Sequence, residues 1–177
     1  MRHARPAAAV LLAAACLLTA CSSSDGDSTK ATASPSQAAK QQEKKATTPT
    51  AKEVGDKLTT AIPTHKTIVV YTEASDPNHL LGRPGGYASK TAFADSRIPK
   101  TETDGERPDA IVRGGSIEAY PDEAGAKVRR DYLAALAKTN PLMKEYDYLH
   151  GTAVLRVSAV LTPTQAKEYE KALATIG

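Results

Sequence analysis

The first twenty residues limit what the rest of the chain can fold into. The first five residues, Met1 to Arg5, include two arginines. An apolar run of about a dozen residues, Ala7 to Leu18, follows them and is followed in turn by Cys21. A basic start, a short apolar run and small residues after it are typical of a cleavable export signal. The run is too short for a membrane-spanning helix, which needs about 20 apolar residues. We therefore expect residues 1–20 to be a signal peptide that takes no part in the fold.

The two cysteines of the 177-residue chain both lie in or beside this segment. Cys16 is inside the apolar run and Cys21 follows it. A domain that begins after Cys21 has no cysteine for a disulfide or a metal site, so an exported domain of this kind depends on its own hydrophobic core.

The sequence Leu18-Thr19-Ala20-Cys21 resembles the lipobox of bacterial lipoproteins. The resemblance implies that diacylglycerol is attached to the sulfur of Cys21 and that the signal is cut just before this residue. Two acyl chains hold a protein stably to a membrane where one does not. We therefore expect a protein anchored to the outer face of the cell membrane. The alternative is an ordinary secretory signal that leaves a free thiol at Cys21.

Residues 21–47 are predicted to be the lipidated cysteine and a disordered tether. The segment from Ser22 to Thr47 is rich in Ser, Thr, Ala, Lys and Gln and has almost no large apolar residue, so it cannot bury enough surface to fold. The formal net charge of the chain is +3, and the loss of Arg2 and Arg5 with the signal leaves +1. No long basic run remains, so we expect no nucleic-acid partner.

Three helices are predicted within residues 48–177, which have the usual length of one domain. Capping boxes place two of the helix starts, at Thr50-Ala51-Lys52-Glu53 and at Thr162-Pro163-Thr164-Gln165. The middle helix is predicted to begin at Pro121-Asp122-Glu123 and to end at Asn140-Pro141. Its i, i+4 stripe is expected to face the core and consists of Ala124, Val128, Tyr132 and Leu136.

Short β-branched and apolar runs predict the strands of a small sheet. These runs are 67–72, 91–95, 115–120, 144–149 and 152–160, and His150-Gly151 is the predicted hairpin turn between the last two. The order of elements predicts an α+β fold, a small antiparallel sheet with about three helices packed on one of its faces. The C-terminal half has the order β-α-β-β-α, which is partly ferredoxin-like.

The long loop from Glu73 to Lys90 is the candidate binding site, because loops of this length in a compact domain are often functional. Its candidate ligand- or partner-binding residues are Asp76, His79, Arg83, Tyr87 and Lys90. In the functional interpretation, Arg83 and its neighbouring glycines form a pocket for an anion, with help from backbone N–H groups.

The same loop has a purely structural interpretation. Asp76-Pro77-Asn78 would form a turn, Leu80 and Leu81 would fill the core, and Arg83 would pair with Asp76 or Glu73. Residues 82–86 lack the Gly-Lys-Ser/Thr ending of a phosphate-binding P-loop. Both interpretations stay open at the level of the sequence.

No familiar catalytic motif occurs in the chain. His-Glu-x-x-His, Gly-x-Ser-x-Gly and the Ser-x-x-Lys of penicillin-binding enzymes are missing, and residues 96–114 lack the acidic pattern of a calcium loop. We therefore expect no metal, no cofactor and a non-enzymatic module that binds a protein or a small molecule. The alternative is an envelope enzyme whose unrecognised site is built from Asp76, His79 and Arg83 in the long loop.

Three stretches resemble small actinobacterial (Streptomyces-like) lipoproteins of unknown function. They are Asp76 to Lys90, Gly114-Gly115-Ser116-Ile117-Glu118 and Leu161-Thr162-Pro163. The resemblance covers the domain of about 130 residues. It implies a membrane-anchored extracytoplasmic lipoprotein and carries no activity with it.

Overall fold

The computed structural model describes residues 48–176. The expected signal peptide, the lipidation site at Cys21 and the tether up to residue 47 lie outside the described residues. In chain order the helices and strands are α1 (Ala51–Ala61), β1 (His65–Val70), β2 (Ser89–Asp95), β3 (Gly114–Ala119), α2 (Glu123–Thr139), β4 (Glu145–His150), β5 (Ala153–Ser158) and α3 (Pro163–Ala174). Three short 3-10 helices lie in the connections, η1 (Lys100–Glu102), η2 (Ile111–Arg113) and η3 (Pro141–Met143).

The five strands form one antiparallel sheet in the order β1-β2-β3-β5-β4, which confirms the predicted α+β fold. Strands β4 and β5 form the predicted hairpin, but its loop is displaced by one residue. His150 pairs with Ala153, so the two loop residues are Gly151 and Thr152. Gly151 has a φ of 52°, and this left-handed conformation is the reason that a tight hairpin takes glycine there.

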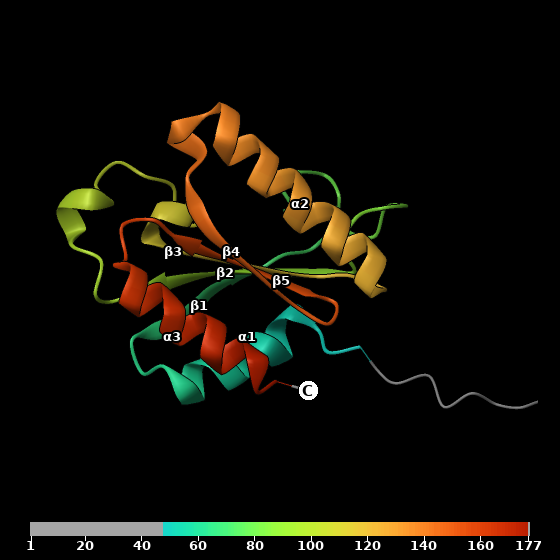
Figure 1. The fold of residues 1–177 in the computed structure, drawn as a ribbon, viewed down its shortest axis with the longest axis horizontal. Helices are drawn as coiled ribbons and strands as arrows, with labels where there is room; N and C mark the ends of the chain where they lie inside the picture. Colours follow the sequence, from blue (N-terminus) through green and yellow to red (C-terminus); the bar gives the residue numbers. More distant parts are fainter. Residues whose placement is uncertain (1–47, 177) are drawn as a thin grey trace, which may run out of the picture. The chain divides into compact units, whose positions relative to one another are not determined.

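Helices cover both faces of the sheet, whereas the sequence indicated one. Val154 and Leu155 are neighbours on β5, so their side chains point to opposite faces. Leu155 belongs to the main core, which α1 and α3 cover, and Val154 packs with Leu133 of α2 in a second cluster. Figure 1 shows α2 on one side of the sheet and α1 with α3 on the other. Because α2 and α3 lie on opposite faces, the ferredoxin-like detail is not confirmed.

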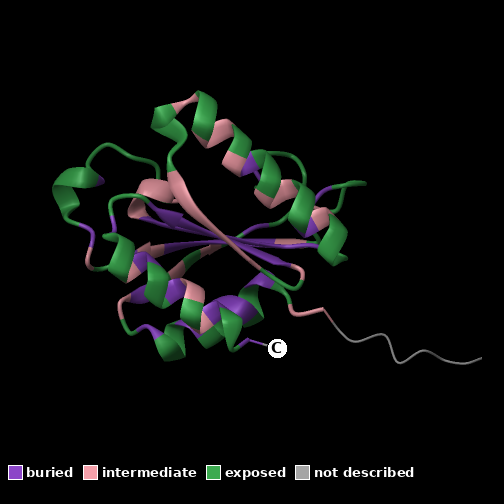
Figure 2. Ribbon diagram, viewed as in Figure 1, coloured by how far each residue is buried: buried purple, intermediate pink, exposed green. Residues whose placement is uncertain are grey.

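Helix α2 presents a different face to the sheet from the one the stripe of apolar residues predicted. Ala126 and Leu133 are buried, but Val128 is 71% exposed and Tyr132 is 56% exposed. Figure 2 shows most of α2 as exposed. The inner face carries Arg129, whose guanidinium reaches the buried carboxylate of Glu118. A charged residue thus lies on the inner side of α2. The predicted apolar stripe was therefore wrong about which face of the helix packs on the sheet.

The predicted starts of the outer two helices are confirmed. Thr50 and Glu53 form a reciprocal capping box at α1, and Thr162 and Gln165 form one at α3. Each cap satisfies backbone N–H groups that have no partner inside the helix. Within residues 48–176, no helix has the length and apolar character needed to span a membrane.

Candidate functional site

Three of the five residues predicted for the site meet in one buried cluster. Asp76 is 1% exposed, and Tyr87 and Lys90 are also buried. The hydroxyl of Tyr87 donates to the carboxylate of Asp76, with distances of 2.7 and 2.6 Å to its two oxygens. The ammonium of Lys90 lies 3.1 Å from Asp76 Oδ1 and also donates to the Tyr87 hydroxyl at 3.3 Å.

The carboxylate of Asp76 also organises the loop around itself. It accepts hydrogen bonds from the backbone N–H groups of Leu80 at 2.9 Å and Leu81 at 3.1 Å. Burial raises the pKa of Asp76, but the hydrogen bonds from Tyr87, Leu80 and Lys90 outweigh it and hold this pKa well below its usual range. Asp76 is therefore an ionised centre of the loop fold at neutral pH.

The other two predicted residues, His79 and Arg83, lie apart from this cluster. Both are exposed, and together with Glu73 they line a separate depression of about 300 Å³. The ion-pair partner of Asp76 is Lys90, and the pairing of Arg83 with Asp76 or Glu73 that the structural interpretation expected is not found within residues 48–176. Leu81 packs against the second apolar cluster, as that interpretation expected, but Leu80 is exposed and does not fill the core.

A second group of charges lies on the α2 side of the sheet, centred on the fully buried Glu118. Its carboxylate accepts hydrogen bonds from Arg129 at 2.7 and 3.0 Å and from Arg156 at 3.3 Å. Burial raises the pKa of Glu118, but the two guanidinium groups lower it by more. Arg156 also binds Glu145 through two N–H donors, at 2.9 and 3.0 Å. Arg156 thus joins two carboxylates across the sheet.

Asp147 is the surplus acid of this region. It stands opposite Arg156 in the β4–β5 ladder, and burial together with the nearby Glu145 raises the pKa of Asp147 to about 7. Its Oδ1 atom has no hydrogen-bond partner in the part of the chain that the structure describes. The Asp76 cluster and the charges around Glu118 together form a charged layer on this face of the sheet. The layer has four acids and three cations, which are Asp76, Glu118, Glu145 and Asp147, and Lys90, Arg129 and Arg156. One proton bound at Asp147 would make the numbers of negative and positive charges equal.

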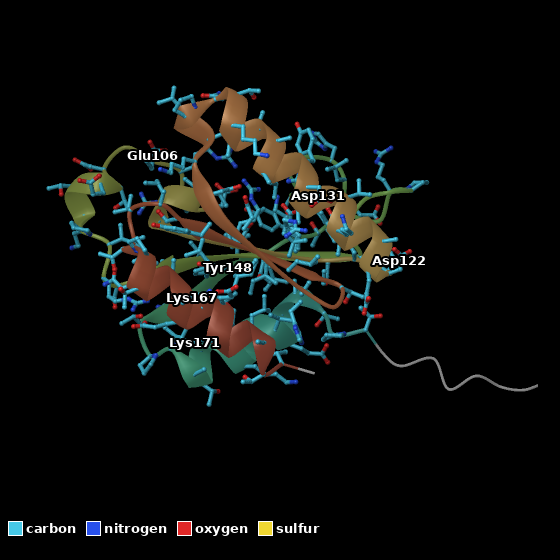
Figure 3. The ribbon with its side chains drawn as sticks, viewed as in Figure 1. Glu106, Asp122, Asp131, Tyr148, Lys167 and Lys171 are labelled. Atoms are coloured by element: carbon cyan, nitrogen blue, oxygen red, sulfur yellow. The ribbon has the colours of Figure 1, made fainter. Side chains whose placement is uncertain are left out.

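A hollow of about 440 Å³ opens onto this charged layer. Its lining includes Tyr71, Asn78, Lys90, Arg107, Ser116 and Arg156. Lys90, Ser116 and Arg156 come from β2, β3 and β5 and share one face of the sheet. The segments on either side of β2 contribute the rest of the wall. Tyr71, Pro77 and Asn78 precede the strand, and the segment that follows it includes Glu106, which Figure 3 labels beside η1 and η2.

Ser116 is the one uncharged polar side chain that the sheet contributes to the hollow. It is 2% exposed, and its hydroxyl oxygen has no hydrogen-bond partner among residues 48–176. An unpaired buried hydroxyl is costly, so its presence in a cavity lining indicates a place where a ligand or water makes the missing bond.

An apolar cavity of about 390 Å³ adjoins the hollow and shares Ile111 and Arg156 with it. Its other lining residues include Leu142, which is 93% exposed, Met143 and Val160. The α2 side of the sheet therefore carries a polar cavity and a mostly apolar cavity on either side of Arg156.

Ser116, Glu118 and Arg156 were not among the residues predicted for the site. The sequence does contain a signal for two of them. Glu118 and Arg156 interrupt the apolar runs of predicted central strands, and ionised side chains are almost never fully buried unless they are paired. A charge in the middle of each of two strands therefore indicates a buried ion pair. No such signal exists for Ser116, because small polar residues are common in strands and loops alike.

Comparison with known proteins gives no match. No family model, no curated protein and no solved structure matches the chain. Among residues 48–176, no group of three or more His, Cys, Asp and Glu side chains is arranged to hold a metal ion.

Proposed function

We propose that the protein is a lipid-anchored extracytoplasmic lipoprotein whose folded domain is a non-enzymatic binding module. The observation that carries the binding role is the hollow above Ser116, with an unpaired hydroxyl in its lining and paired cations beside it. Its volume of about 440 Å³ lies in the range of small-molecule sites, about 300–1,000 Å³. The anchor is proposed from the sequence Leu18-Thr19-Ala20-Cys21.

The alternative is an envelope enzyme with its site in the loop of residues 76–90. A general acid or base works best with a pKa near the working pH. The hydrogen bonds to Asp76 hold its pKa far below that range, and His79 and Arg83 lie outside its cluster. This arrangement favours a loop that folds around Asp76 over a loop that performs catalysis.

Ligand-observed NMR with a set of small polar fragments tests the binding role. In Ala110→Phe, a large side chain occupies the hollow, because Ala110 is part of its lining. Ala135→Phe is the matched control, since Ala135 is exposed on α2 and does not line the hollow. We expect fragments that bind the wild type and the control but not Ala110→Phe. If no fragment distinguishes the two variants, the hollow is not the binding site.

The anchor has its own test, independent of the ligand. We expect mass spectrometry of the protein from its native host to show diacylglycerol on an N-terminal Cys21, and Cys21→Ser to lose both the lipid and the membrane fraction. Cys16→Ser is the matched control and should keep both, because Cys16 lies inside the predicted signal. An unmodified thiol at the processed N-terminus would refute the lipoprotein proposal.

A further inference from the structure

Four of the five charged groups that line the hollow are already paired within the protein; the fifth, Glu106, is exposed and has no ion pair among the described residues. Lys90 is paired with Asp76 at 3.1 Å, and Arg107 with Asp109 at 2.6 Å. Arg156 is paired with Glu118 at 3.3 Å and with Glu145 at 2.8 Å. An anion would have to give up water without meeting an unpaired cation, and a cation would meet only the solvent-facing carboxylate of Glu106 beside three positive groups, so the entry of either charge costs free energy.

Both signs of ligand charge would also meet groups that repel them. An anion in the hollow would approach the carboxylates of Glu106 and Asp109, which belong to its lining. A cation would approach Lys90, Arg107 and Arg156 in the same lining. The electrostatics of the hollow therefore favour an uncharged occupant.

The hollow retains hydrogen-bonding capacity for such an occupant. The Lys90 ammonium has three N–H donors, and two hydrogen bonds from it are formed, to Asp76 and Tyr87. The Arg156 guanidinium has five donors, of which three are bonded to carboxylates. The hydroxyl of Ser116 has no partner in the described part of the chain.

Acceptors are present beside these donors. Asp109 accepts from the hydroxyl of Tyr71 at 2.7 Å and from Arg107, and a carboxylate has about four lone-pair positions. The side-chain amide of Asn78 donates to Tyr87 and has a carbonyl oxygen as well. A ligand that donates and accepts at several neighbouring atoms matches this mixture.

We infer that the hollow binds an uncharged polyhydroxyl compound of the saccharide class. Hydroxyl groups both donate and accept, so adjacent hydroxyls on a sugar ring match a lining that presents both donors and acceptors. The ion pairs of the wall stay intact when such a ligand enters. This inference rests on the proposed binding function and adds the class of ligand to it.

The test is an NMR titration of the purified protein with uncharged mono- and disaccharides, each beside its uronic acid and its amino-sugar counterpart. Each set of three shares its ring and differs in charge. We expect the uncharged member to bind most tightly and to shift resonances of residues in the hollow. Ser116→Ala should weaken this binding about fivefold, the size of one lost hydrogen bond.

Thr91→Val is the matched control for Ser116→Ala. Thr91 is also buried with an unpaired hydroxyl, but it pairs with Ile117 on the α1 and α3 side of the sheet. We expect Thr91→Val to leave saccharide affinity unchanged. Equal weakening by both variants would overturn the role of Ser116.

The remaining outcomes separate this inference from the proposed function. A uronic acid or an amino sugar that binds in the hollow more tightly than its uncharged parent would overturn the saccharide inference and leave the binding function standing. The same holds if polar fragments bind in the hollow and no uncharged saccharide does. If neither fragments nor saccharides bind there, both proposals fail.

Discussion

Lys90 of β2 stands directly opposite Glu118 of β3 in the antiparallel ladder, and both side chains are buried. Each has its own closest partner, Asp76 for Lys90 and Arg129 for Glu118. The positive charge of Lys90 also helps to lower the pKa of Glu118. The loop cluster and the charges beneath α2 are therefore one connected layer, and the hollow opens onto it.

Loss of the Asp76 carboxylate should destabilise the part of the charged layer that the loop contributes. We expect Asp76→Ala to lower the free energy of unfolding by about 3–5 kcal/mol, because it leaves the buried ammonium of Lys90 without a counter-charge. The hydroxyl of Tyr87 loses its acceptor as well. Urea unfolding followed by circular dichroism measures the effect.

The exposed residues of the same loop provide the control. We expect His79→Ala and Arg83→Ala to change the free energy of unfolding by no more than about 0.5 kcal/mol, because neither side chain belongs to the cluster. A loss at Arg83→Ala as large as that at Asp76→Ala would contradict the observed pairing.

His65 and Asp147 should change the free energy of unfolding in opposite directions as the pH rises. Burial lowers the pKa of His65 to about 4, with Asp95 opposing this, so the unfolded state binds a proton that the folded state rejects and stability falls as pH drops below 6.5. Asp147 acts the other way. Its raised pKa of about 7 means that the folded state keeps a proton the unfolded state has lost, so stability falls as pH rises toward 7.

Single variants should reveal each slope. With Asp147→Asn, we expect stability to rise between about pH 5 and about pH 6.5, and to exceed that of the wild type by about 4 kcal/mol at about pH 8, because each unit of the raised pKa is worth about 1.4 kcal/mol. With His65→Phe, we expect stability to fall over the same interval, while the wild type stays nearly level. Urea unfolding at a series of pH values measures all three. Parallel curves for the three proteins would exclude these assignments.

Gly115 is predicted to tolerate no side chain. A Cβ atom there would lie 2.0 Å from the carbonyl oxygen of Arg156 and 2.6 Å from the ring of Phe93. We expect Gly115→Ala to cost about 3 kcal/mol or more, because the crowded atoms belong to a paired strand and a core ring. Gly105→Ala is the matched control, with open space around it and a left-handed φ of 76°. We expect Gly105→Ala to lower the free energy of unfolding by about 1 kcal/mol. Thermal unfolding of the two variants measures the difference.

The rotation of α2 is open to a direct test. We expect Val128→Lys to change the free energy of unfolding by no more than about 0.5 kcal/mol, because the side chain is exposed. Leu133→Ala should cost about 2–5 kcal/mol, because Leu133 is buried in the second cluster. Chemical denaturation of the two variants gives the comparison. The reverse order would support the stripe that the sequence indicated.

The sequence determined the features of the folded domain that depend on near neighbours. The capping box of Thr50 and Glu53, the helix start at Asp122 and the strand runs of the sheet follow from residues a few positions apart, and the structure has each of them. The β4–β5 hairpin was predicted within one residue, since Gly151 is the residue that adopts a positive φ. Such local preferences act before any tertiary contact forms.

Tertiary structure alone decided which charges are buried and where the hollow lies. Asp76 pairs with Lys90, fourteen residues away, because the loop between β1 and β2 folds around the Asp76 carboxylate at the start of β2. Glu118 pairs with Arg156, thirty-eight residues away, because β3 and β5 are neighbours in the sheet. Arg129 faces the sheet in place of Val128 because Glu118 lies buried beneath α2. The periodicity of a single helix or strand carries no information about where a distant counter-charge lies. In a buried layer, the position of that counter-charge determines which charged side chains can face inward.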